Sequence, residues 1–323
     1  MCCHGAVRYY SILFPRFNPK EAPVRALLLV MASLLALSAC SSNQFLNATA
    51  SDSGYTLSQN VAFDDATALK LDVYAPPNAA NAPVVIFFFG GRWSEGVKEQ
   101  YKFVGQALAA RGFVAVIPNY RLYPQVHYQD ILGDNAKAVA WAHGHIAGYG
   151  GSPARIVLMG HSTGAYDAAM LTLDPEFLVR AGGNRSWVRG MIGLAGPYDF
   201  LPITDPDLRD LFAPPENYEK TQPIFYVDGN NPPLLLMHGG KDQTVDIKNT
   251  NNLFDRVKRA GGAADKVIYP ELDHGRILDV TATRLQGYAD VMDKIDAFVR
   301  RVTVGNAPNS VQPSSIQTYV PPK

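Results

Sequence analysis

Apolar runs and amphipathic stretches alternate along most of the chain. The clearest run, residues 83–89, is continuously apolar and rich in β-formers, which predicts a strand buried on both faces. Residues 101–111 place apolar side chains at helical spacing and are followed by Gly112, which predicts a helix that ends there. The same reasoning predicts strands at 113–117, 155–160, 188–194, 234–238 and 266–269, and helices at 126–147, 163–173, 246–260 and 285–302.

Two segments depart from this alternation. Residues 55–74 contain two stretches of period two, separated by Asp64 and Asp65, which predicts an antiparallel hairpin at the edge of the sheet. Residues 201–233 are rich in Pro, Asp and Asn and have no clean period, so we expect an irregular insertion over the sheet. The alternation of strands and helices predicts an α/β fold, with a mostly parallel twisted sheet and helices on both faces. Ligands bind such sheets at the carboxyl ends of the strands.

The first forty residues differ in kind from the rest. They carry four basic residues and one acid, followed by an apolar run at 26–37 and the sequence Leu37-Ser38-Ala39-Cys40. The run is too short to span a bilayer comfortably and has the size of a signal-peptide core. Small residues directly before a cysteine resemble the bacterial lipobox. This resemblance implies cleavage before Cys40, acylation of its thiol, and export to a lipid-anchored position at a bacterial cell envelope membrane.

Composition narrows the functional classes further. The chain has 323 residues, of which 47% are apolar, and its 29 Lys and Arg balance its 29 Asp and Glu. This is enough for one large core and too neutral to indicate a nucleic-acid partner. Cys2 and Cys3 fall within the predicted leader, which leaves Cys40 as the only thiol. The mature domain therefore has no disulfide, no cysteine nucleophile and no cysteine–metal cluster.

The strongest chemical signal is a Gly-x-Ser-x-Gly motif at Gly160–Gly164, which lies between a predicted strand and a predicted helix. This is the context of a nucleophile elbow, a sharp turn that exposes a serine hydroxyl above the sheet. The strand and helix come so close there that the residues two before and two after the serine need to lack a Cβ. Ser162 is therefore our candidate nucleophile.

A serine hydroxyl needs a base within hydrogen-bond reach and a third group that orients the base. In proteins with such an elbow, the acid comes after the serine in the chain, and the histidine comes after the acid. Only two histidines come after the elbow. His274 lies in a loop after the last strand and is our candidate base, whereas His238 is better explained as a packed residue at a strand end.

Asp242 follows the strand at 234–238 and is our candidate acid. Asp246 is its rival, but it stands where a helix N-cap is expected. Asp273 adjoins His274 and is expected to point away from it as a solvated loop residue. Asp199, which follows a Pro-Tyr pair, is better explained as a turn or cap residue.

The reaction also needs donors for a developing oxyanion. One is the backbone N–H of Thr163, at the positive end of the helix that follows the serine. The loop Gly90–Trp93, directly after the first buried strand, can supply the second because its glycines expose backbone N–H groups. One such donor contributes about 3–4 kcal/mol of transition-state stabilisation in known enzymes.

Four motifs in order resemble a known family. They are Phe89-Gly90-Gly91-Arg92-Trp93, Asn119-Tyr120-Arg121-Leu122, Gly160-His161-Ser162-Thr163-Gly164 and Gly240-Lys241-Asp242-Gln243-Thr244-Val245. Together they resemble the α/β-hydrolase fold over about residues 62–302. The most similar branch contains bacterial feruloyl-esterase-like, isoprenylcysteine-methylesterase-like and kynurenine-formamidase-like proteins. The resemblance implies hydrolysis of carboxylic esters through Ser162, Asp242 and His274. Its oxyanion donors, carried over by position, are Thr163 and Gly91, with Arg92 or Gly90 as alternatives.

Two positions depart from the family pattern. Relatives usually have a histidine at the position of Phe89, where it helps to hold the oxyanion loop. Packing of Phe89 and Trp93 would have to hold the loop in this chain. Relatives commonly have alanine at the position of Thr163, a difference that keeps the required N–H.

The leading hypothesis is a serine esterase that acts through an acyl-enzyme, with no metal or cofactor, on a small-molecule ester. One alternative is an arylformamidase-type amide hydrolase with the same residues. Another is a catalytically silent, lipid-anchored binding protein. Arg92 and Arg121 could contact an acidic group of a substrate, but structural or solvated roles are favoured for both.

These inferences divide the chain into four segments. We expect a lipoprotein signal peptide at 1–39, a flexible tether at 40–54, an α/β-hydrolase domain at 55–303 and a disordered tail at 304–323. The sequence specifies neither the acyl and alcohol groups of the substrate nor the oligomeric state.

Overall fold

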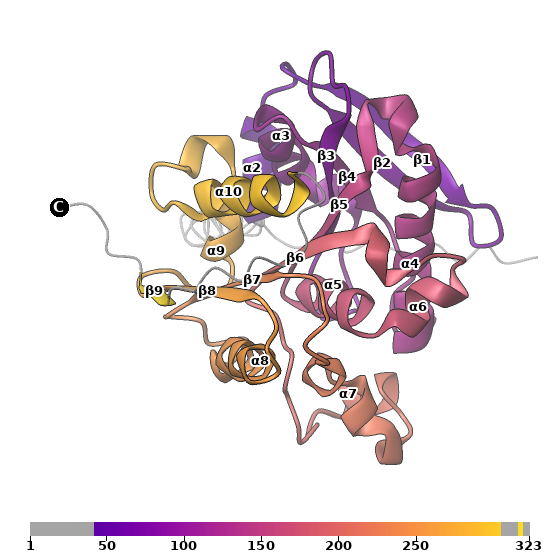
Figure 1. The fold of residues 1–323 in the computed structure, drawn as a ribbon, viewed down its shortest axis with the longest axis vertical. Coiled ribbons are helices and arrows are strands. Elements are labelled where there is room, and N and C mark those ends of the chain that lie inside the picture. The colour runs from indigo at the N-terminus through magenta and orange to yellow at the C-terminus, as the bar shows by residue number, and fades with distance from the viewer. Residues whose placement is uncertain (1–41, 305–315, 319–323) are drawn as a thin grey trace, which may run out of the picture. The chain divides into compact units, whose positions relative to one another are not determined.

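A nine-stranded sheet forms the centre of the part of the chain that the structure, a computed structural model, describes, namely residues 42–304 and 316–318 (Figure 1). The predicted signal peptide and Cys40 lie outside the described residues. The strand order is β1-β2-β4-β3-β5-β6-β7-β8-β9. The strands are β1 (Thr56–Asp64), β2 (Leu69–Ala75), β3 (Ala82–Phe88), β4 (Val114–Pro118), β5 (Gly151–His161), β6 (Val188–Leu194), β7 (Leu234–Gly239), β8 (Ala264–Tyr269) and β9 (Ile316–Thr318).

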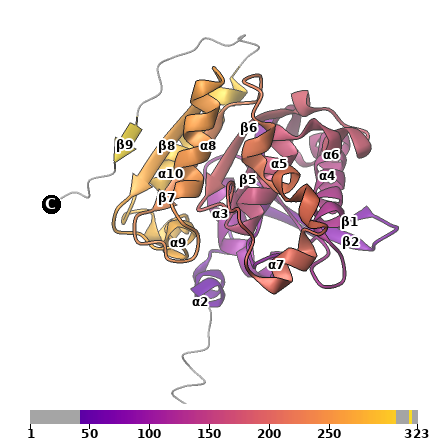
Figure 2. The ribbon, with the colours of Figure 1, turned by 90° about the horizontal axis from the view of Figure 1, so that it is seen from below.

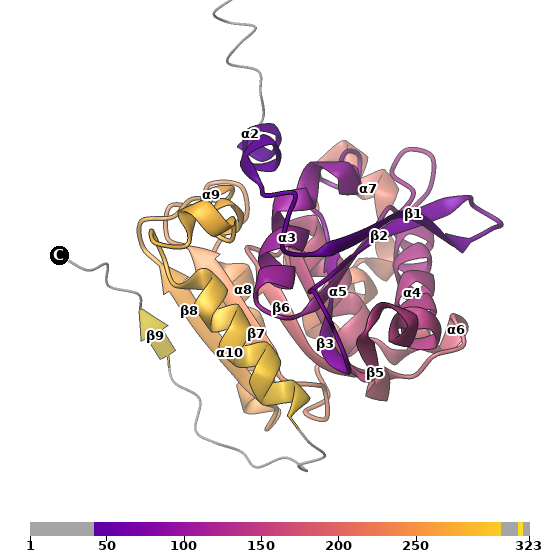
Figure 3. The same cartoon turned by 90° about the horizontal axis from the view of Figure 1, so that it is seen from above.

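Helices cover both faces of this sheet. The α-helices are α2 (Ser42–Thr49), α3 (Lys102–Ala110), α4 (Tyr128–His145), α5 (Thr163–Leu173), α6 (Pro175–Arg180), α7 (Pro206–Leu211), α8 (Lys248–Arg259), α9 (Arg276–Asp279) and α10 (Val291–Thr303). Helices α3 and α10 lie on one face and α4, α5 and α8 on the other, as Figures 2 and 3 show. None of the helices within residues 42–304 is both long and apolar enough to cross a bilayer.

The predicted fold class is confirmed. Strands β3 to β8 run parallel, and the antiparallel hairpin β1–β2 joins the sheet edge through β2 and β4. Every residue of β3 is buried, as is every residue of β7, because helices cover both of their faces. The core is therefore one continuous layer of apolar side chains on each side of the sheet.

The expected flexible tether is corrected over Ser42–Thr49, which forms α2. One apolar side chain, Leu46, is only 5% exposed. The Asn47 side chain accepts a hydrogen bond from the Phe103 backbone N–H in the first turn of α3 (3.1 Å) and donates to the Glu99 carbonyl (2.7 Å). These two contacts anchor the segment to the domain, and the polar composition of Ser42–Thr49 does not predict them.

The expected disordered tail is also corrected at one place. Ile316–Thr318 pairs in parallel with β8 as β9. A strand at the end of a sheet has open backbone donors and acceptors, and β9 pairs with those of β8. Of the rest of the expected tail, only Val304 lies within the described residues.

The irregular insertion at 201–233 is mostly irregular, as expected, but it contains short helical turns. Helix α7 is preceded by Asp205, whose side chain accepts hydrogen bonds from the Asp207 and Leu208 backbone N–H groups. Two 3₁₀ turns, Pro215–Thr221 and Pro223–Tyr226, follow it. The final helix begins at Val291 rather than 285, because a 3₁₀ turn at Thr283–Leu285 and a loop occupy the intervening residues.

Two glycines inside helices test this packing as a matched pair. A Cβ at Gly133 in α4 would meet no atom within 4 Å, whereas a Cβ at Gly105 in α3 would lie 2.5 Å from the buried Tyr74 ring. We expect Gly133→Ala to raise the free energy of unfolding by about 0.5–1 kcal/mol. Gly105→Ala should lower it by about 1–3 kcal/mol because the ring has no space to move. Urea denaturation measures both, and equal shifts would contradict this packing.

Candidate active site

The Gly-x-Ser-x-Gly motif forms a sharp turn between β5 and α5, as predicted. Ser162 has φ of 55° and ψ of −124°, an unfavourable conformation for a residue with a side chain. A Cβ on Gly160 would lie 2.1 Å from the Gly164 carbonyl oxygen, and one on Gly164 would lie 2.1 Å from the Phe88 carbonyl oxygen. The two glycines therefore allow the strand and helix to approach each other and fix the serine in its strained position.

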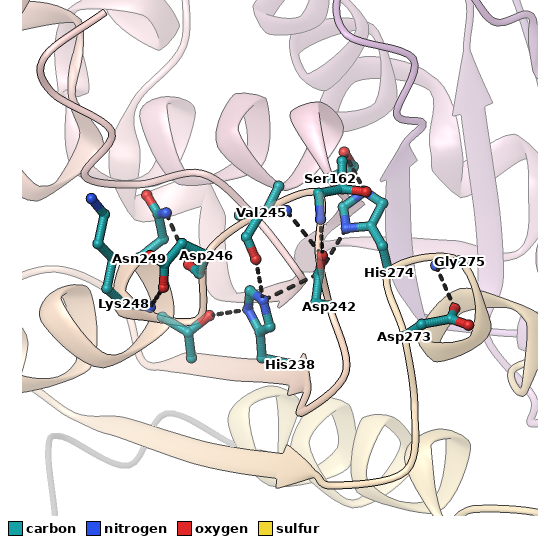
Figure 4. A network of polar contacts seen from close by, with 12 residues as sticks. Ser162, His238, Asp242, Val245, Asp246, Lys248, Asn249, Asp273, His274 and Gly275 are labelled. Atoms are coloured by element: carbon teal, nitrogen blue, oxygen red, sulfur yellow. Dashed lines mark hydrogen bonds and ion pairs between the residues drawn. The ribbon is translucent and has the colours of Figure 1, made fainter.

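Ser162, His274 and Asp242 form a continuous hydrogen-bonded chain, shown in Figure 4. The distance from His274 Nε2 to Ser162 Oγ is 2.9 Å, and that from His274 Nδ1 to Asp242 Oδ2 is 2.8 Å. Asp242 follows β7, His274 follows β8 and Ser162 follows β5. The structure thus brings together, at the carboxyl ends of three parallel strands, the three residues that the sequence nominated.

Asp242 lies in an environment that favours its charged form. Its side chain is fully buried, and its Oδ1 accepts hydrogen bonds from the Thr244 and Val245 backbone N–H groups at 2.8 and 2.9 Å. Burial opposes ionisation, but the hydrogen bonds of His238, His274 and Val245 outweigh it and hold the pKa of Asp242 well below its usual range. A permanently charged carboxylate at this place can orient His274 and stabilise its cation.

His238 is a packed histidine at a strand end, as expected, but it also belongs to the surroundings of the acid. It is fully buried, and its ring bonds to the Val245 carbonyl (2.9 Å) and to Thr250 Oγ1 (2.8 Å). Its Nε2 lies 3.2 Å from Asp242 Oδ2. Because its ring bonds to these three residues and not to Ser162, it supports the acid rather than replacing the base.

The rival carboxylates have other partners. Asp246 Oδ1 accepts from the Lys248 N–H at the start of α8 (2.9 Å), but the N-cap residue of this helix is Ile247, so the expected capping role is displaced by one residue. Asp273 accepts from the backbone N–H groups of Gly275 and Arg276 and points away from His274 in Figure 4. Asp199 accepts from Asn252 Nδ2 (2.7 Å). None of the three shares a hydrogen bond with His274 among the described residues.

The loop Gly90–Trp93 lies against the elbow. A Cβ on Gly90 would stand 2.9 Å from both the His161 carbonyl oxygen and Ser162 Cβ, so only glycine fits there. Within the described residues, the backbone N–H groups of Gly91 and Arg92 donate to no backbone acceptor. Thr163 is the first residue of α5, and its N–H has no acceptor within the helix. These groups belong to the loop that packs against Ser162 through Gly90 and to the helix that follows the serine.

Both candidate substrate-binding arginines are paired with carboxylates, which agrees with the structural roles favoured for them. Arg121 makes two hydrogen bonds to the buried Asp134, from Nε and from Nη2, each 2.8 Å long. Arg92 Nη2 donates to Asp205 Oδ2 at 2.5 Å. This second pair links the loop Gly90–Trp93 to the insertion, because Asp205 caps α7.

His161 has a role in the site that its sequence context did not predict. This residue is buried beside Ser162, and its Nε2 donates to the His274 backbone carbonyl at 2.7 Å. Burial, and then the neighbouring His274, lower the pKa of His161 to about 3, so the ring is neutral at pH 7. It holds the loop that carries His274. The only signal in the sequence was its place inside the Gly-x-Ser-x-Gly motif.

The mostly parallel sheet, the strained serine turn and the bonded Ser–His–Asp chain define an α/β-hydrolase-fold protein. A sequence profile of the BD-FAE family matches residues 71–257, more than half of the chain. The chain therefore belongs to the BD-FAE family.

Individual relatives agree with this placement. The chain is 28% identical over 238 residues to the isoprenylcysteine alpha-carbonyl methylesterase ICME of Arabidopsis thaliana. This match covers 67% of this chain and 56% of that protein. It is 28% identical over 227 residues to the probable carboxylic ester hydrolase LipM of Mycobacterium tuberculosis, with coverages of 62% and 51%. The chain thus spans about half the length of the curated relatives that it matches.

Solved structures show the same fold. The apo form of Thermogutta terrifontis esterase 2 matches with a TM-score of 0.66 at 24% identity, over 79% of this chain and 97% of that one. The Pyrobaculum calidifontis esterase matches with a TM-score of 0.68 at 20% identity, over 82% and 91%.

The depressed pKa of Asp242 predicts how stability depends on pH. Because the folded-state pKa lies below the unfolded value of about 4, the stabilisation by the carboxylate is present above that pH and is lost as the pH falls. Asp242→Asn should lower the free energy of unfolding by about 2 kcal/mol at neutral pH. Below about pH 4, this difference from the wild type should shrink by about 1.4 kcal/mol per pH unit.

Urea denaturation at several pH values measures this difference. Asp273→Asn, which removes a half-exposed carboxylate from the neighbouring loop, is the control for loss of a negative charge. A deficit of Asp242→Asn that stayed constant from neutral to acid pH would refute the assignment.

Proposed function

We propose that the protein is a serine hydrolase that cleaves carboxylic esters through an acyl-enzyme. The observation that carries the proposal is the hydrogen-bonded chain from Ser162 through His274 to Asp242. A serine hydroxyl becomes an effective nucleophile when a base accepts its proton and a third group orients that base. The names of the relatives, which include a methylesterase and a carboxylic ester hydrolase, support the same reaction class.

In this mechanism Ser162 Oγ attacks the ester carbonyl while His274 Nε2 accepts the hydroxyl proton. The imidazolium then donates this proton to the departing alkoxide, which leaves as the alcohol. Water, deprotonated by His274, attacks the acyl-enzyme, and the imidazolium returns the proton to Ser162 Oγ as the acid leaves. Asp242 keeps the second ring proton of His274 on Nδ1 and stabilises the cation, which is why its low pKa matters.

The proposed oxyanion donors are the backbone N–H groups of Thr163 and Gly91, with Arg92 or Gly90 as alternatives for the second. Thr163 adds the positive end of the α5 dipole to its own N–H. The conformation of Gly91, with φ of 138°, lies in a region that residues with side chains rarely adopt. Such donors act on the tetrahedral intermediate, where the carbonyl oxygen carries a full negative charge.

The insertion is our candidate for the part that selects the substrate. It contains an open pocket of about 590 Å³. The pocket is lined by Leu201, Pro202, Ile203, Arg209, Pro215 and Tyr218. Its walls are mainly apolar, so we propose that an apolar acyl or alcohol group of the ester binds there.

Replacing the nucleophile tests the reaction. Ser162→Ala should lower kcat for p-nitrophenyl acetate by at least about 10⁴-fold, because the acyl-enzyme can no longer form. The variant should also lose labelling by a fluorophosphonate. Ser186→Ala, which changes an exposed serine in a 3₁₀ turn, is the control and should keep both properties. Turnover that survives in Ser162→Ala would overturn the proposal, and preferential cleavage of N-formylkynurenine over aryl esters would favour an arylformamidase.

We also propose that the protein is exported and anchored to a bacterial cell envelope membrane through a lipid on Cys40. The support is the basic leader, the apolar run at 26–37 and the small residues before the cysteine. Helix α2 begins at Ser42, so a lipid on Cys40 would be attached two residues before a helix that packs on the domain.

Lipid attachment is tested by growing cells that express the full chain with an alkyne fatty acid. The wild type should incorporate the label and sediment with membranes. Cys40→Ser should lose the label and leave the membrane fraction, since a single thiol carries the lipid. The variants Cys2→Ser and Cys3→Ser, which change cysteines of the predicted leader, should behave as the wild type does. Labelling of Cys40→Ser would contradict the proposed site.

A further inference from the structure

The loop Gly90–Trp93 has a backbone that cannot hold its shape by itself. Three consecutive residues have positive φ, namely Gly91 at 138°, Arg92 at 54° and Trp93 at 60°. For the two residues with side chains, each such angle costs free energy, on the order of 1 kcal/mol or more. The loop therefore depends on contacts with the rest of the protein.

One set of contacts holds the start of the loop. The Phe89 ring stacks between Tyr101 and Tyr120, with ring centroids 5.3 and 4.4 Å away. The Tyr120 hydroxyl donates to the Phe89 carbonyl at 2.6 Å, and the Tyr101 hydroxyl donates to the Gly90 carbonyl at 3.3 Å. Aromatic stacking and two tyrosine hydroxyls thus hold the loop at the position where relatives usually have a histidine.

A different contact holds the end of the loop. The Trp93 indole is buried, and its Nε1 donates to Asp167 Oδ1 at 3.1 Å. Asp167 is completely buried, and its Oδ2 accepts from Asn135 Nδ2 at 3.1 Å. Both donors are neutral, and burial raises the pKa of Asp167 to about 8 although these two hydrogen bonds act in the opposite direction.

A buried carboxyl group with only neutral partners is unfavourable for folding. The position of Asp167 in the fold suggests a functional role instead. Asp167 lies on α5, the helix whose first residue, Thr163, offers a proposed oxyanion donor. The hydrogen bond from Trp93 therefore connects the loop that offers one donor directly to the rigid helix that offers the other.

We propose that Asp167 is a positioning residue, which fixes the oxyanion loop relative to the N-terminus of α5 through its hydrogen bond with the Trp93 indole. The proposal rests on the ester hydrolase function proposed above. In this arrangement Asp167 touches no substrate. It sets the separation between the N–H of Thr163 and that of Gly91 or Arg92, to which the reaction is sensitive because a displacement of about 1 Å can cost 100-fold in rate.

Two substitutions remove the same hydrogen bond from opposite sides. Asp167→Leu keeps the branched shape and removes the acceptor, whereas Trp93→Phe keeps an aromatic ring and removes the donor. Each should lower kcat for an aryl ester by about 10- to 100-fold with little change in KM, since the loss falls on the transition state. The double variant should lose no more than the more impaired single variant, because both act through one contact.

Asp167→Asn is the conservative rescue. Its Oδ1 can accept from Trp93, and its amide can donate to Asn135 Oδ1, which lacks a hydrogen-bond partner in this structure, once the Asn135 amide turns over. It should keep kcat within about threefold of the wild type, as expected when the geometry is preserved. Thr172→Val, which removes a buried hydrogen bond within α5 to the Ala168 carbonyl, is the control for lost stability alone.

A comparison of an oxo ester with its thiono analogue separates positioning from a general loss of folded protein. Sulfur accepts hydrogen bonds weakly, so well-placed oxyanion donors favour the oxo ester. Asp167→Leu and Trp93→Phe should reduce the ratio of the oxo to the thiono rate, whereas Thr172→Val should leave it unchanged. An unchanged ratio in the first two variants, or a double variant with multiplied losses, would overturn the proposal.

The activity of the wild type shows whether the proposed hydrolase function or the positioning role of Asp167 has failed. If it neither hydrolyses esters nor reacts with a fluorophosphonate, the proposed function itself fails. If the wild type is active and Asp167→Leu retains its full kcat, the function stands and the positioning role of Asp167 is wrong.

Discussion

The close approach of β5, α5 and β3 at the serine turn is the constraint on which the rest of the site depends. Gly160 and Gly164 leave no room for a Cβ, and Gly164 lies against the carbonyl groups of Phe88 and Phe89 at the end of β3. Any side chain there would push α5 away from β3. The serine, the first N–H of α5 and the loop Gly90–Trp93 would then move apart from one another. The same close approach of α5 to β3 positions all three.

Two loops flank Ser162, and in each a buried side chain holds a backbone carbonyl. His161 donates to the carbonyl of His274, and Tyr120 donates to the carbonyl of Phe89. A bond to a carbonyl fixes the backbone without using the groups that chemistry requires. It leaves the His274 ring free for Ser162 and Asp242, and within the described residues the N–H groups of Gly91 and Arg92 in the proposed oxyanion loop donate to no backbone acceptor. Neutral or weakly acidic donors suit this task because they add no charge beside Asp242.

The features that the sequence predicted well are those encoded by neighbouring residues. The run at 83–89 and the motif at Gly160–Gly164 indicate a buried strand and a tight turn regardless of the rest of the chain. Asp242 and His274 could be nominated because the chain order of such sites is known and few candidates follow the serine. By contrast, α2 is held by single contacts with residues more than fifty positions away, which no local pattern reveals.

The role of Asp167 could not be predicted from the sequence for a related reason. A carboxylate in the middle of a helix usually marks a solvated face, and only the fold places it beneath Trp93, 74 residues earlier in the chain. Trp93 in turn packs edge-on against Phe212 of the insertion, with 5.1 Å between ring centroids, while Arg92 pairs with Asp205 of the same segment. Under the proposed function, the segment that selects the substrate therefore touches two residues of the loop that stabilises the oxyanion. Substrate choice and catalytic rate are then physically coupled, because an insertion that shifts to fit a different ester also presses on Trp93 and Arg92.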